Sequence, residues 1–514
     1  MVLSGQERKI FILLSILSFT VFTLTSDGHR YSFDEDVIQQ QSMWLATMTP
    51  HPMFVPGESR ELFQFPEYFP DNARPICKIG ILCSQVPIGN AITQVPFIVL
   101  NQNFNFITEN TVEFTTDDFN DSHYIYWRNS LDSDFTFLEL FYGPTFMGLS
   151  VGLFFLISKT YPFSTRTSTI LSLLFGFSTS IWAYSQTSLN LIPTTFFVLL
   201  GFYFFKKFLS NTSSSINLLF SAIALGFGFL VRHDTILYII PLFGFLTLNW
   251  LRNSNKIKNA FAFVTPLVSS YVIQSQLRSF AIDGNSSILP NIGAGLAKSN
   301  NILLNSFGML FSPGVGLLIF CPILFTFFLS YFDFFKKNKS ECILFISFIV
   351  ITLIVYGNNE SWHGLNGWAD RYLTTLIPFL LLPLGFSIEK RGGKKFTSIL
   401  IGLGSLGVIF NIAYLLTDVS WFIWGIMGSE KGLYALGSIG QHLWIHPLVL
   451  WTFDYSQLTH AIRYAMIDLH PDIFLLKIWG LLFYGIFFTV SISLMITYLF
   501  YLNKNSVKSL KTLS

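Results

Sequence analysis

The stretch FILLSILSFTVFTLT, residues 11–25, contains no charged side chain, and SFDEDVIQQQSMW, residues 32–44, follows it closely with three adjacent acids. An apolar run of this kind is typical of a membrane-spanning helix, although a run this short also resembles the apolar part of a signal peptide. No small-residue cleavage motif follows it, because the chain continues as SDGHRYSFDED. We therefore predict that residues 1–25 form a retained N-terminal anchor helix.

The composition extends this interpretation to the whole chain. Of 514 residues, 51% are hydrophobic and 12% are charged, about half of the ~25% charged residues typical of soluble domains. Apolar runs of membrane length recur along the chain, which predicts an all-α polytopic membrane protein with about twelve transmembrane helices. The expected spans are roughly 10–25, 139–158, 167–184, 190–206, 215–231, 235–251, 259–277, 312–332, 341–357, 372–388, 396–417 and 474–502.

Lysine and arginine are unevenly distributed between the two sides that these spans define. The side that holds both termini carries 19 of the 31 basic residues and 4 of the 29 acids in its short connections and tails. Positive charge collects on the cytoplasmic side of membrane proteins. We therefore predict a multi-pass protein of the cell membrane with cytoplasmic N- and C-termini, whose acidic, active side is extracytoplasmic.

Two segments on the predicted external side are too long to be simple connections. The first, residues 26–138, begins with a helical pattern and carries the acidic motif, and the β-branched residues of its middle part, 92–118, favour some strand. The second, residues 418–473, is rich in Trp, His and Tyr, which predicts amphipathic helices at the membrane surface. A transmembrane bundle is expected over 139–417, and a last transmembrane helix with a cytoplasmic tail over 474–514.

Several classes of function and site find no support in the sequence. The predicted cytoplasmic loops are short and contain neither a Walker motif nor a dinucleotide-binding glycine pattern. The net charge of +2 gives no indication of nucleic-acid binding, and we predict no such partner. Cys77 and Cys83 share the first external segment, where a disulfide and two free thiols are equal alternatives. No metal-ligand cluster accompanies them, so we predict no metal or other cofactor, and a divalent metal has no supporting motif.

Helical geometry separates the three adjacent acids. At 100° per residue, Glu35 and Asp36 fall on a mostly polar face, for which exposure to solvent is a sufficient explanation. Asp34 instead shares a face with apolar side chains, and partial desolvation there suits a general base; its alternative role is a structural ion pair with Arg30, one turn earlier. The apolar side chains on that face are Phe33, Val37, Ile38, Trp44, Leu45 and Met48.

A second charged cluster, Arg232, His233 and Asp234, interrupts two apolar runs in FLVRHDTILYIIP. Charges at a membrane edge are costly and usually functional, although a short loop also needs polar caps. A guanidinium binds phosphate oxygens in a bidentate manner, so Arg232, with His233 beside it, is a candidate for binding a phosphate or diphosphate.

A third cluster lies where two predicted spans meet the outer surface, and it contains Glu360, His363, Asp370 and Arg371. Arg371 begins a long apolar span and is expected at headgroup depth. Snorkelling beside Asp370 is one explanation. We favour the other, in which this cluster binds an anionic headgroup or a substrate phosphate.

Five segments together show a familiar pattern. They resemble the GT-C superfamily of membrane glycosyltransferases, which includes protein mannosyltransferases and aminoarabinose transferases, and related bacterial and archaeal membrane proteins. The resemblance covers most of residues 10–390. The segments are FDEDVIQ (33–39), IWAYSQTSLNLIPTTFFVLLGFYFF (181–205), LGFGFLVRHDTILYIIPLF (225–243), FGMLFSPGVGLLIFCPILF (307–325) and SWHGLNGWADRYLTTLIPFLLLPL (361–384).

The resemblance implies an inverting glycosyltransferase that moves a sugar from a polyprenyl-phosphate donor to an acceptor at the outer membrane face. It makes Asp34 the candidate base, with Glu35 as its neighbour, and makes Arg232 and Arg371 candidates for binding the lipid phosphate. The expected partners are this lipid-linked donor and membrane lipids, and the acceptor is not identified. The triple acid, and WADRY in place of the family's GPRY, depart from the family pattern.

Two other functions remain open at this point. A transporter or flippase for a lipid or glycolipid predicts broken helices and ionisable residues near the middle of the membrane. A non-enzymatic membrane scaffold would use its long external segments to bind surface proteins. The enzyme, in contrast, requires Asp34, Arg232 and Arg371 to line one cavity at the outer boundary.

Overall fold

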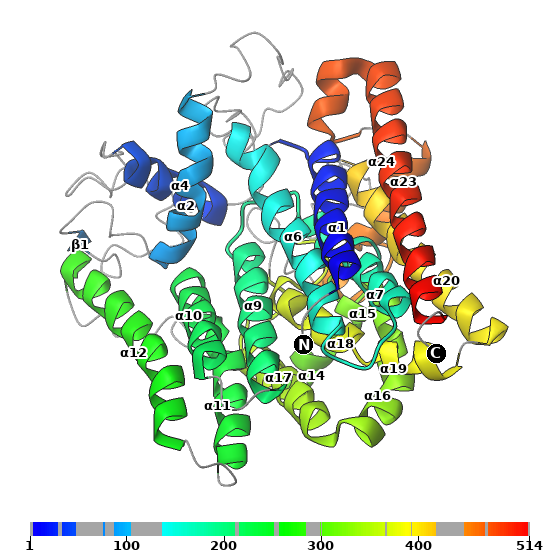
Figure 1. Ribbon diagram of the computed structural model, residues 1–514. Coiled ribbons are helices and arrows are strands. Elements are labelled where there is room, and N and C mark those ends of the chain that lie inside the picture. Colours follow the sequence, from blue (N-terminus) through cyan, green and yellow to red (C-terminus); the bar gives the residue numbers. More distant parts are fainter. Residues whose placement is uncertain are drawn as a thin grey trace. The chain divides into compact units, whose positions relative to one another are not determined.

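The computed structural model describes thirteen parts of the chain, in which helices predominate (Figure 1). Two short strands, β1 (Ile76–Cys77) and β2 (Ile282–Asp283), pair antiparallel. The described residues are 4–28, 33–47, 76–77, 87–103, 136–210, 215–250, 256–283, 299, 301–364, 367–391, 393–417, 447–467 and 471–511.

The chain forms two compact units, each made from separate stretches of sequence. The first unit contains Met1–Gly28, Gly143–Gln186 and Ala297–Ser514. The second contains His29–Tyr142 and Thr187–Leu296, so helix α6 (Thr136–Ser158) begins in the second unit and ends in the first.

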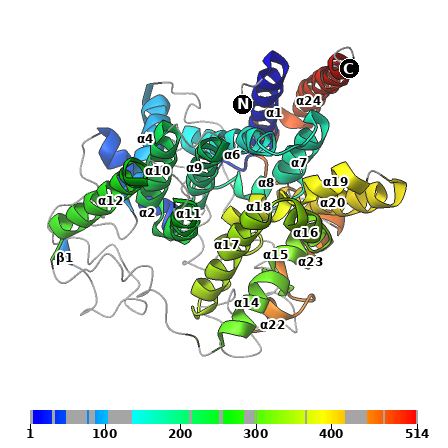
Figure 2. The ribbon, with the colours of Figure 1, turned by 60° about the horizontal axis from the view of Figure 1, so that its bottom comes forward.

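In the first unit, α1 (Gly5–Leu24) begins with a capping box. The Ser4 hydroxyl accepts from the Glu7 backbone, and the Glu7 carboxylate accepts from the Ser4 backbone. This helix packs beside α24 (Phe474–Lys511) (Figure 2). The other elements of this unit are α7 (Thr165–Phe177), α8 (Ile181–Tyr184), α14 (Ile302–Phe311), α15 (Leu317–Phe320), η5 (Pro322–Phe325), α16 (Thr326–Lys337), α17 (Lys339–Gly357), η6 (Arg371–Leu376), α18 (Ile377–Leu381), α19 (Leu384–Arg391), α20 (Lys394–Leu415), α22 (Pro447–Trp451) and α23 (Gln457–Ile467).

In the second unit, α10 packs against both α9 and α12. Small residues allow the close approach of these helices: the Ser221 hydroxyl donates to the Gly201 carbonyl at 2.8 Å, and a Cβ at Gly226 would lie 2.5 Å from the Ser270 hydroxyl. The elements of this unit are α2 (Phe33–Thr47), α4 (Ile88–Asn103), α9 (Leu191–Ser210), α10 (Ser215–Val231), η4 (His233–Thr235), α11 (Ile236–Trp250) and α12 (Lys256–Ala281), with β1 and β2.

Six helices in the described parts of the chain are long and apolar enough to cross a membrane. Three shorter apolar helices accompany them, at Ser215–Val231, His233–Leu248 and Ile302–Phe311. The expected helical, multi-pass membrane protein is therefore confirmed, while the number of twelve spans, the domain boundaries and the side on which the termini lie stay predictions.

Some predicted spans are not continuous helices. The span expected at 167–184 breaks after α7, where the Asn411 side chain of α20 donates to the carbonyls of Phe177 (3.3 Å) and Thr179 (3.0 Å). A Cβ at Gly407 would lie 2.3 Å from the Ser178 carbonyl oxygen, so only glycine permits this approach. A break inside a membrane requires such partners for the backbone groups that it releases.

The span expected at 312–332 is divided in the same way among α15, η5 and α16. Its sequence begins SPGVG, and Pro322 at the start of η5 interrupts the helix again. The Gly314 amide donates to the Leu450 carbonyl of α22 at 3.1 Å, and the Ser312 hydroxyl donates to the same carbonyl. The partners of both breaks come from segments distant in sequence, which a local pattern does not reveal.

The strand predicted in the first external segment is wrong for residues 92–103, which are helical and belong to α4. The β-branched residues of this segment favoured strand, but tertiary packing overrides that preference. α4 packs against α2 and α10 and places Asn90 and Gln94 among polar partners. Cys77 lies in β1, whereas Cys83 and most of the second external segment lie outside the described residues, so the disulfide stays a prediction.

Candidate functional site

The acidic motif lies at the start of α2, as its helical pattern predicted. The expectation that Glu35 is solvated is wrong, because its side chain is 0% exposed. The side chains of Asp34 and Asp36 lie outside the described residues, so the role of Asp34 as a base stays a prediction.

A short loop before α9 holds the Glu35 carboxylate in place. Its Oε1 accepts from the backbone N–H of Ser188 at 2.8 Å and from the Ser188 hydroxyl at 3.4 Å. The Gln39 amide donates to the Ser188 hydroxyl at 2.9 Å and also to the carboxylate of Glu139 in α6. Two buried carboxylates, Glu35 and Glu139, therefore belong to one hydrogen-bonded network (both are at most 5% exposed).

The polar face of α2 is buried because polar partners lie opposite it. Glu35, Gln39 and Ser42 recur at helical spacing and so share one face. Ser42 donates to the Gln94 side chain at 2.8 Å, and the amide of Gln94 donates to the Ser188 carbonyl at 3.1 Å. Buried polar groups of this kind require hydrogen-bond partners, and α4 and the loop at Ser188 provide them.

The antiparallel pair α9 and α10 places Ser188 and Arg232 at the same end. Phe197 of α9 contacts Phe227 of α10, with ring centroids 4.7 Å apart. Six residues further in each direction, the chain reaches Leu191 at the start of α9 and His233 just after α10. The loop that anchors Glu35 and the loop that carries Arg232 therefore lie at the same end of this helix pair.

Helix α4 connects these two loops independently. A Cβ at Gly89 would lie 2.5 Å from the Leu230 backbone, next to Arg232, whereas Gln94 bonds to Ser188. Gly89 and Gln94 are five helical steps apart, a rise of about 7.5 Å. The second unit thus gathers an anchored carboxylate and an arginine at one end of its helices.

The second charged cluster, Arg232, His233 and Asp234, is called the RHD cluster below, and local contacts hold its three residues. The Nε of Arg232 lies 2.9 Å from a carboxylate oxygen of Asp234, and both side chains are largely buried. The ring of His233 is buried against Phe229, with ring centroids 5.1 Å apart. A planar guanidinium has five N–H donors and can bind phosphate oxygens in a bidentate manner.

The third cluster lies in the first unit. Asp370 is fully buried and caps η6, accepting from the Tyr372 backbone N–H at 2.8 Å. The preceding residue, Ala369, has φ of 66°, and its carbonyl accepts from the Tyr184 hydroxyl at 2.9 Å. A non-glycine residue with positive φ is costly and needs such support from its surroundings.

Arg371 is held over the turn that precedes it. A Cβ at Gly364, which has φ of 69°, would lie 2.9 Å from the Cγ of Arg371, so the arginine stem occupies the space that glycine leaves. Its guanidinium carbon lies 5.7 Å from the centroid of the Tyr372 ring, and that ring stacks on Tyr356 at 4.1 Å. Glu360, in contrast, is exposed and makes no part of this arrangement.

His363 is buried beside Arg371, between two predicted spans. Burial, together with the positive charge of Arg371, lowers its pKa from the ordinary 6.5 to about 4. His363 is therefore neutral at pH 7, which argues against a role as a cationic phosphate ligand.

The depressed pKa of His363 predicts a loss of stability in mild acid. His363 binds a proton more tightly in the unfolded chain than in the folded chain. Its contribution to the free energy of unfolding is therefore complete above pH 6.5 and is lost as the pH falls towards about 4. The loss approaches about 3 kcal/mol at its limit. Melting temperatures of wild type and His363→Gln in detergent between pH 7 and pH 4 check this, and parallel curves for the two proteins would contradict it.

The Glu35 network predicts a graded effect of substitution on stability. Glu35→Gln retains an acceptor for the Ser188 N–H and should change the free energy of unfolding little. Glu35→Ala leaves that buried N–H without its partner and should cost about 1–3 kcal/mol. Thermal unfolding of the two variants tests this hydrogen bond. An equal loss of stability in both variants would show that the effect comes from the lost charge and not from the lost acceptor.

Sequence reasoning missed Gln39, Gln94, Glu139, Ser188 and Tyr184, although each contacts a predicted site residue or its network. The spacing of Glu35 and Gln39 on one helical face, and the acid Glu139 in the first turn of an apolar helix, were available signals. Within the parts of the chain that the structure describes, no group of His, Cys, Asp or Glu could hold a metal ion.

The structure brings the predicted residues together in two groups. Glu35, Arg232 and His233 belong to the second unit, and His363, Asp370 and Arg371 to the first. That the two groups line one cavity stays a prediction.

Comparison with known proteins points to one class of enzyme. No curated protein matches the chain. Residues 144–274, however, match the dolichyl-phosphate-mannose-protein mannosyltransferase family, and this part of the chain includes the loop at Ser188 and the RHD cluster. The match confirms the predicted resemblance, and the chain is thus similar to membrane glycosyltransferases of the GT-C superfamily.

Proposed function

We propose that the protein is an inverting glycosyltransferase that transfers a sugar from a polyprenyl-phosphate donor to an acceptor at the outer face of the membrane. The observation that carries the proposal is the family match over residues 144–274. This matched part contains Ser188, which holds the Glu35 carboxylate next to the candidate base Asp34 in the sequence. It also contains Arg232, a candidate for binding the donor phosphate.

In the proposed reaction the acceptor oxygen attacks the anomeric carbon of the sugar, and the bond from that carbon to the phosphate oxygen breaks. The acceptor proton passes to the Asp34 carboxylate, which acts as general base. Glu35, fixed by Ser188, positions the start of α2. The electron pair leaves with the polyprenyl phosphate, whose charge an arginine stabilises, and Arg232 and Arg371 are the two candidates for this role. A single displacement of this kind inverts the anomeric configuration.

The breaks in the predicted spans bear on the transporter alternative. A transporter uses broken helices to bind ions or charged substrates, with ionisable groups near the break. The breaks after α7 and after α14 instead carry serine, threonine, proline and glycine in STS (178–180) and SPGVG (312–316). Their backbone groups bond to Asn411 and Leu450, so these breaks favour a structural role over ion transport.

The proposal is tested by deleting the gene and analysing surface glycans and glycoproteins by mass spectrometry. Loss of one glycan modification is expected, with restoration by the wild-type chain. In parallel, proteoliposomes that contain the purified protein and polyprenyl-phosphate-linked sugar should release free polyprenyl phosphate when extracts containing the acceptor are added. Unchanged glycans together with no donor consumption would overturn the proposal.

A further inference from the structure

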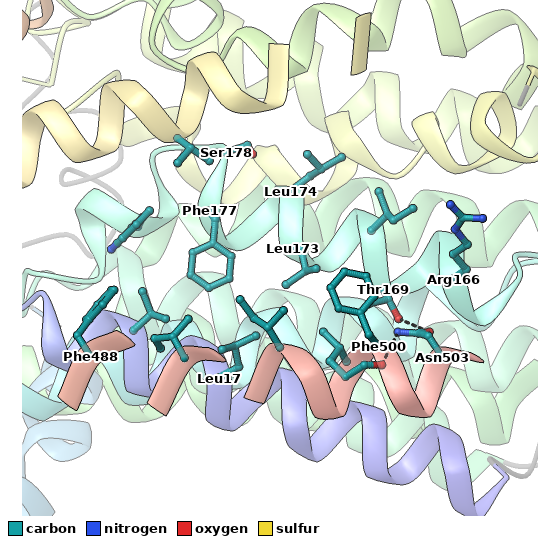
Figure 3. A pocket seen from close by; sticks show the side chains of 17 residues that line it. Leu17, Arg166, Thr169, Leu173, Leu174, Phe177, Ser178, Phe488, Phe500 and Asn503 are labelled. Carbon is teal, nitrogen blue, oxygen red and sulfur yellow. Dashed lines mark hydrogen bonds between the residues drawn. The ribbon is translucent and has the colours of Figure 1, made fainter. Parts of the chain in front are cut away.

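An apolar cavity of about 820 Å³ lies within the first unit, between α1, α7, α20 and α24 (Figure 3). Leucine, isoleucine, valine and phenylalanine side chains make most of its lining. Its volume lies within the range of about 300–1,000 Å³ that small-molecule sites occupy. The residues of the candidate functional site do not line it, so that site does not account for the cavity.

The two ends of the cavity differ in polarity. Arg166 is exposed at one end, and it is the only charged residue among the described residues that line the cavity. Beside it, the Thr169 hydroxyl bonds to the Asn503 side chain at 3.3 Å, whereas Phe177 and Phe488 lie towards the other end (Figure 3). The indole N–H of Trp182, also in the lining, donates to Thr25 at 3.0 Å, so that polar atom needs no ligand.

The length of the cavity matches one leaflet of a bilayer. From Arg166 to Phe177, α7 contributes lining residues over eleven helical steps, a rise of about 16.5 Å. One half of a hydrocarbon core of about 30 Å is slightly shorter than this. A single acyl chain therefore fits lengthwise, with its polar head at Arg166.

We propose that this cavity binds one acyl chain of an anionic glycerophospholipid, whose phosphate contacts Arg166. Charge complementarity at one end and the match to one leaflet carry the assignment. A polyprenyl phosphate has a longer chain than one leaflet accommodates. Arg166 also belongs to the side predicted to be cytoplasmic, whereas the proposed sugar transfer uses the outer face. The lipid occupies space between α7 and α24 that the protein's own side chains leave unfilled.

The test measures lipid binding to the full-length protein in neutral detergent by native mass spectrometry. Phosphatidylglycerol and phosphatidylcholine with identical acyl chains serve as probes. Wild type should bind phosphatidylglycerol about fivefold more tightly, as expected for one arginine near an anionic headgroup. Arg166→Gln should abolish this preference. Lys336→Gln, which removes an exposed positive charge of the first unit outside the cavity, is the matched control and should retain it.

Substitutions that fill the cavity provide a second, independent test of lipid binding. Leu173→Trp from α7 and Val408→Phe from α20 should each reduce binding of both lipids, and a variant that folds as judged by its elution and melting curve is sufficient for the test. The proposal is overturned if Arg166→Gln keeps the preference for phosphatidylglycerol, or if a folded, filled variant binds lipid as wild type does. Tighter binding of polyprenyl phosphate than of phosphatidylglycerol would assign the cavity to that lipid instead.

Discussion

Asp34→Asn is expected to abolish sugar transfer while leaving the melting temperature within error of wild type. Asparagine has the size of aspartate but cannot accept the acceptor's proton, and the loss of a general base typically costs about 10²–10⁴-fold in rate. The helix that carries Asp34 should remain in place, because Glu35, the next residue, is bonded to the Ser188 backbone. Release of polyprenyl phosphate in proteoliposomes measures the effect.

The neighbouring acids provide matched controls for this prediction. Asp36→Asn removes the same charge two residues away and should keep nearly full activity. Glu35→Gln keeps the acceptor for Ser188, so a loss of activity with unchanged stability would show that the charge of Glu35 also contributes. If Asp34→Asn transfers sugar at the wild-type rate, Asp34 is not the base, and the buried pair Glu35 and Glu139 become the next carboxylates to examine.

How far the sequence predicts the fold depends on which interactions are local. Apolar runs are local, so α1, α6, α9 and α17 appear close to the expected positions. The breaks at 178–180 and 312–316 depend on Asn411, Gly407 and Leu450, which are distant in sequence. Hydropathy averaged over a stretch of sequence therefore predicts one continuous span where the folded chain has separate shorter helices.

The acidic motif shows the same limit at the level of one side chain. Helical geometry placed Asp34 and Glu35 on different faces in the prediction, but it equated a polar face with a solvated one. That equation fails when another polar surface covers the face, as α4 and the loop at Ser188 cover Glu35 and Gln39. The polar partners come from three separate segments, and no pattern within the motif indicates them.

Arg232→Ala is expected to lower kcat/KM for the lipid-linked donor by between about 10-fold and 100-fold, mainly through KM. This range corresponds to about 1.5–3 kcal/mol for a hydrogen bond to a charged group. Arg232→Lys should recover part of the loss, since it restores the charge but not the bidentate geometry. Donor titrations in proteoliposomes, with the acceptor extract held constant, give the two kinetic parameters.

Asp234→Asn distinguishes donor binding from a purely structural ion pair. Arg232 and Asp234 contact each other at 2.9 Å, so a structural pair predicts similar losses of melting temperature when either partner is replaced, with the donor KM unchanged in both. Phosphate recognition predicts something different, because only the arginine carries the donor-binding charge. Asp234→Asn should then keep or lower the donor KM, while Arg232→Ala raises it. An unchanged KM in Arg232→Ala would remove this residue from the proposed site and leave the phosphate to Arg371, whose own guanidinium is already held over Tyr372.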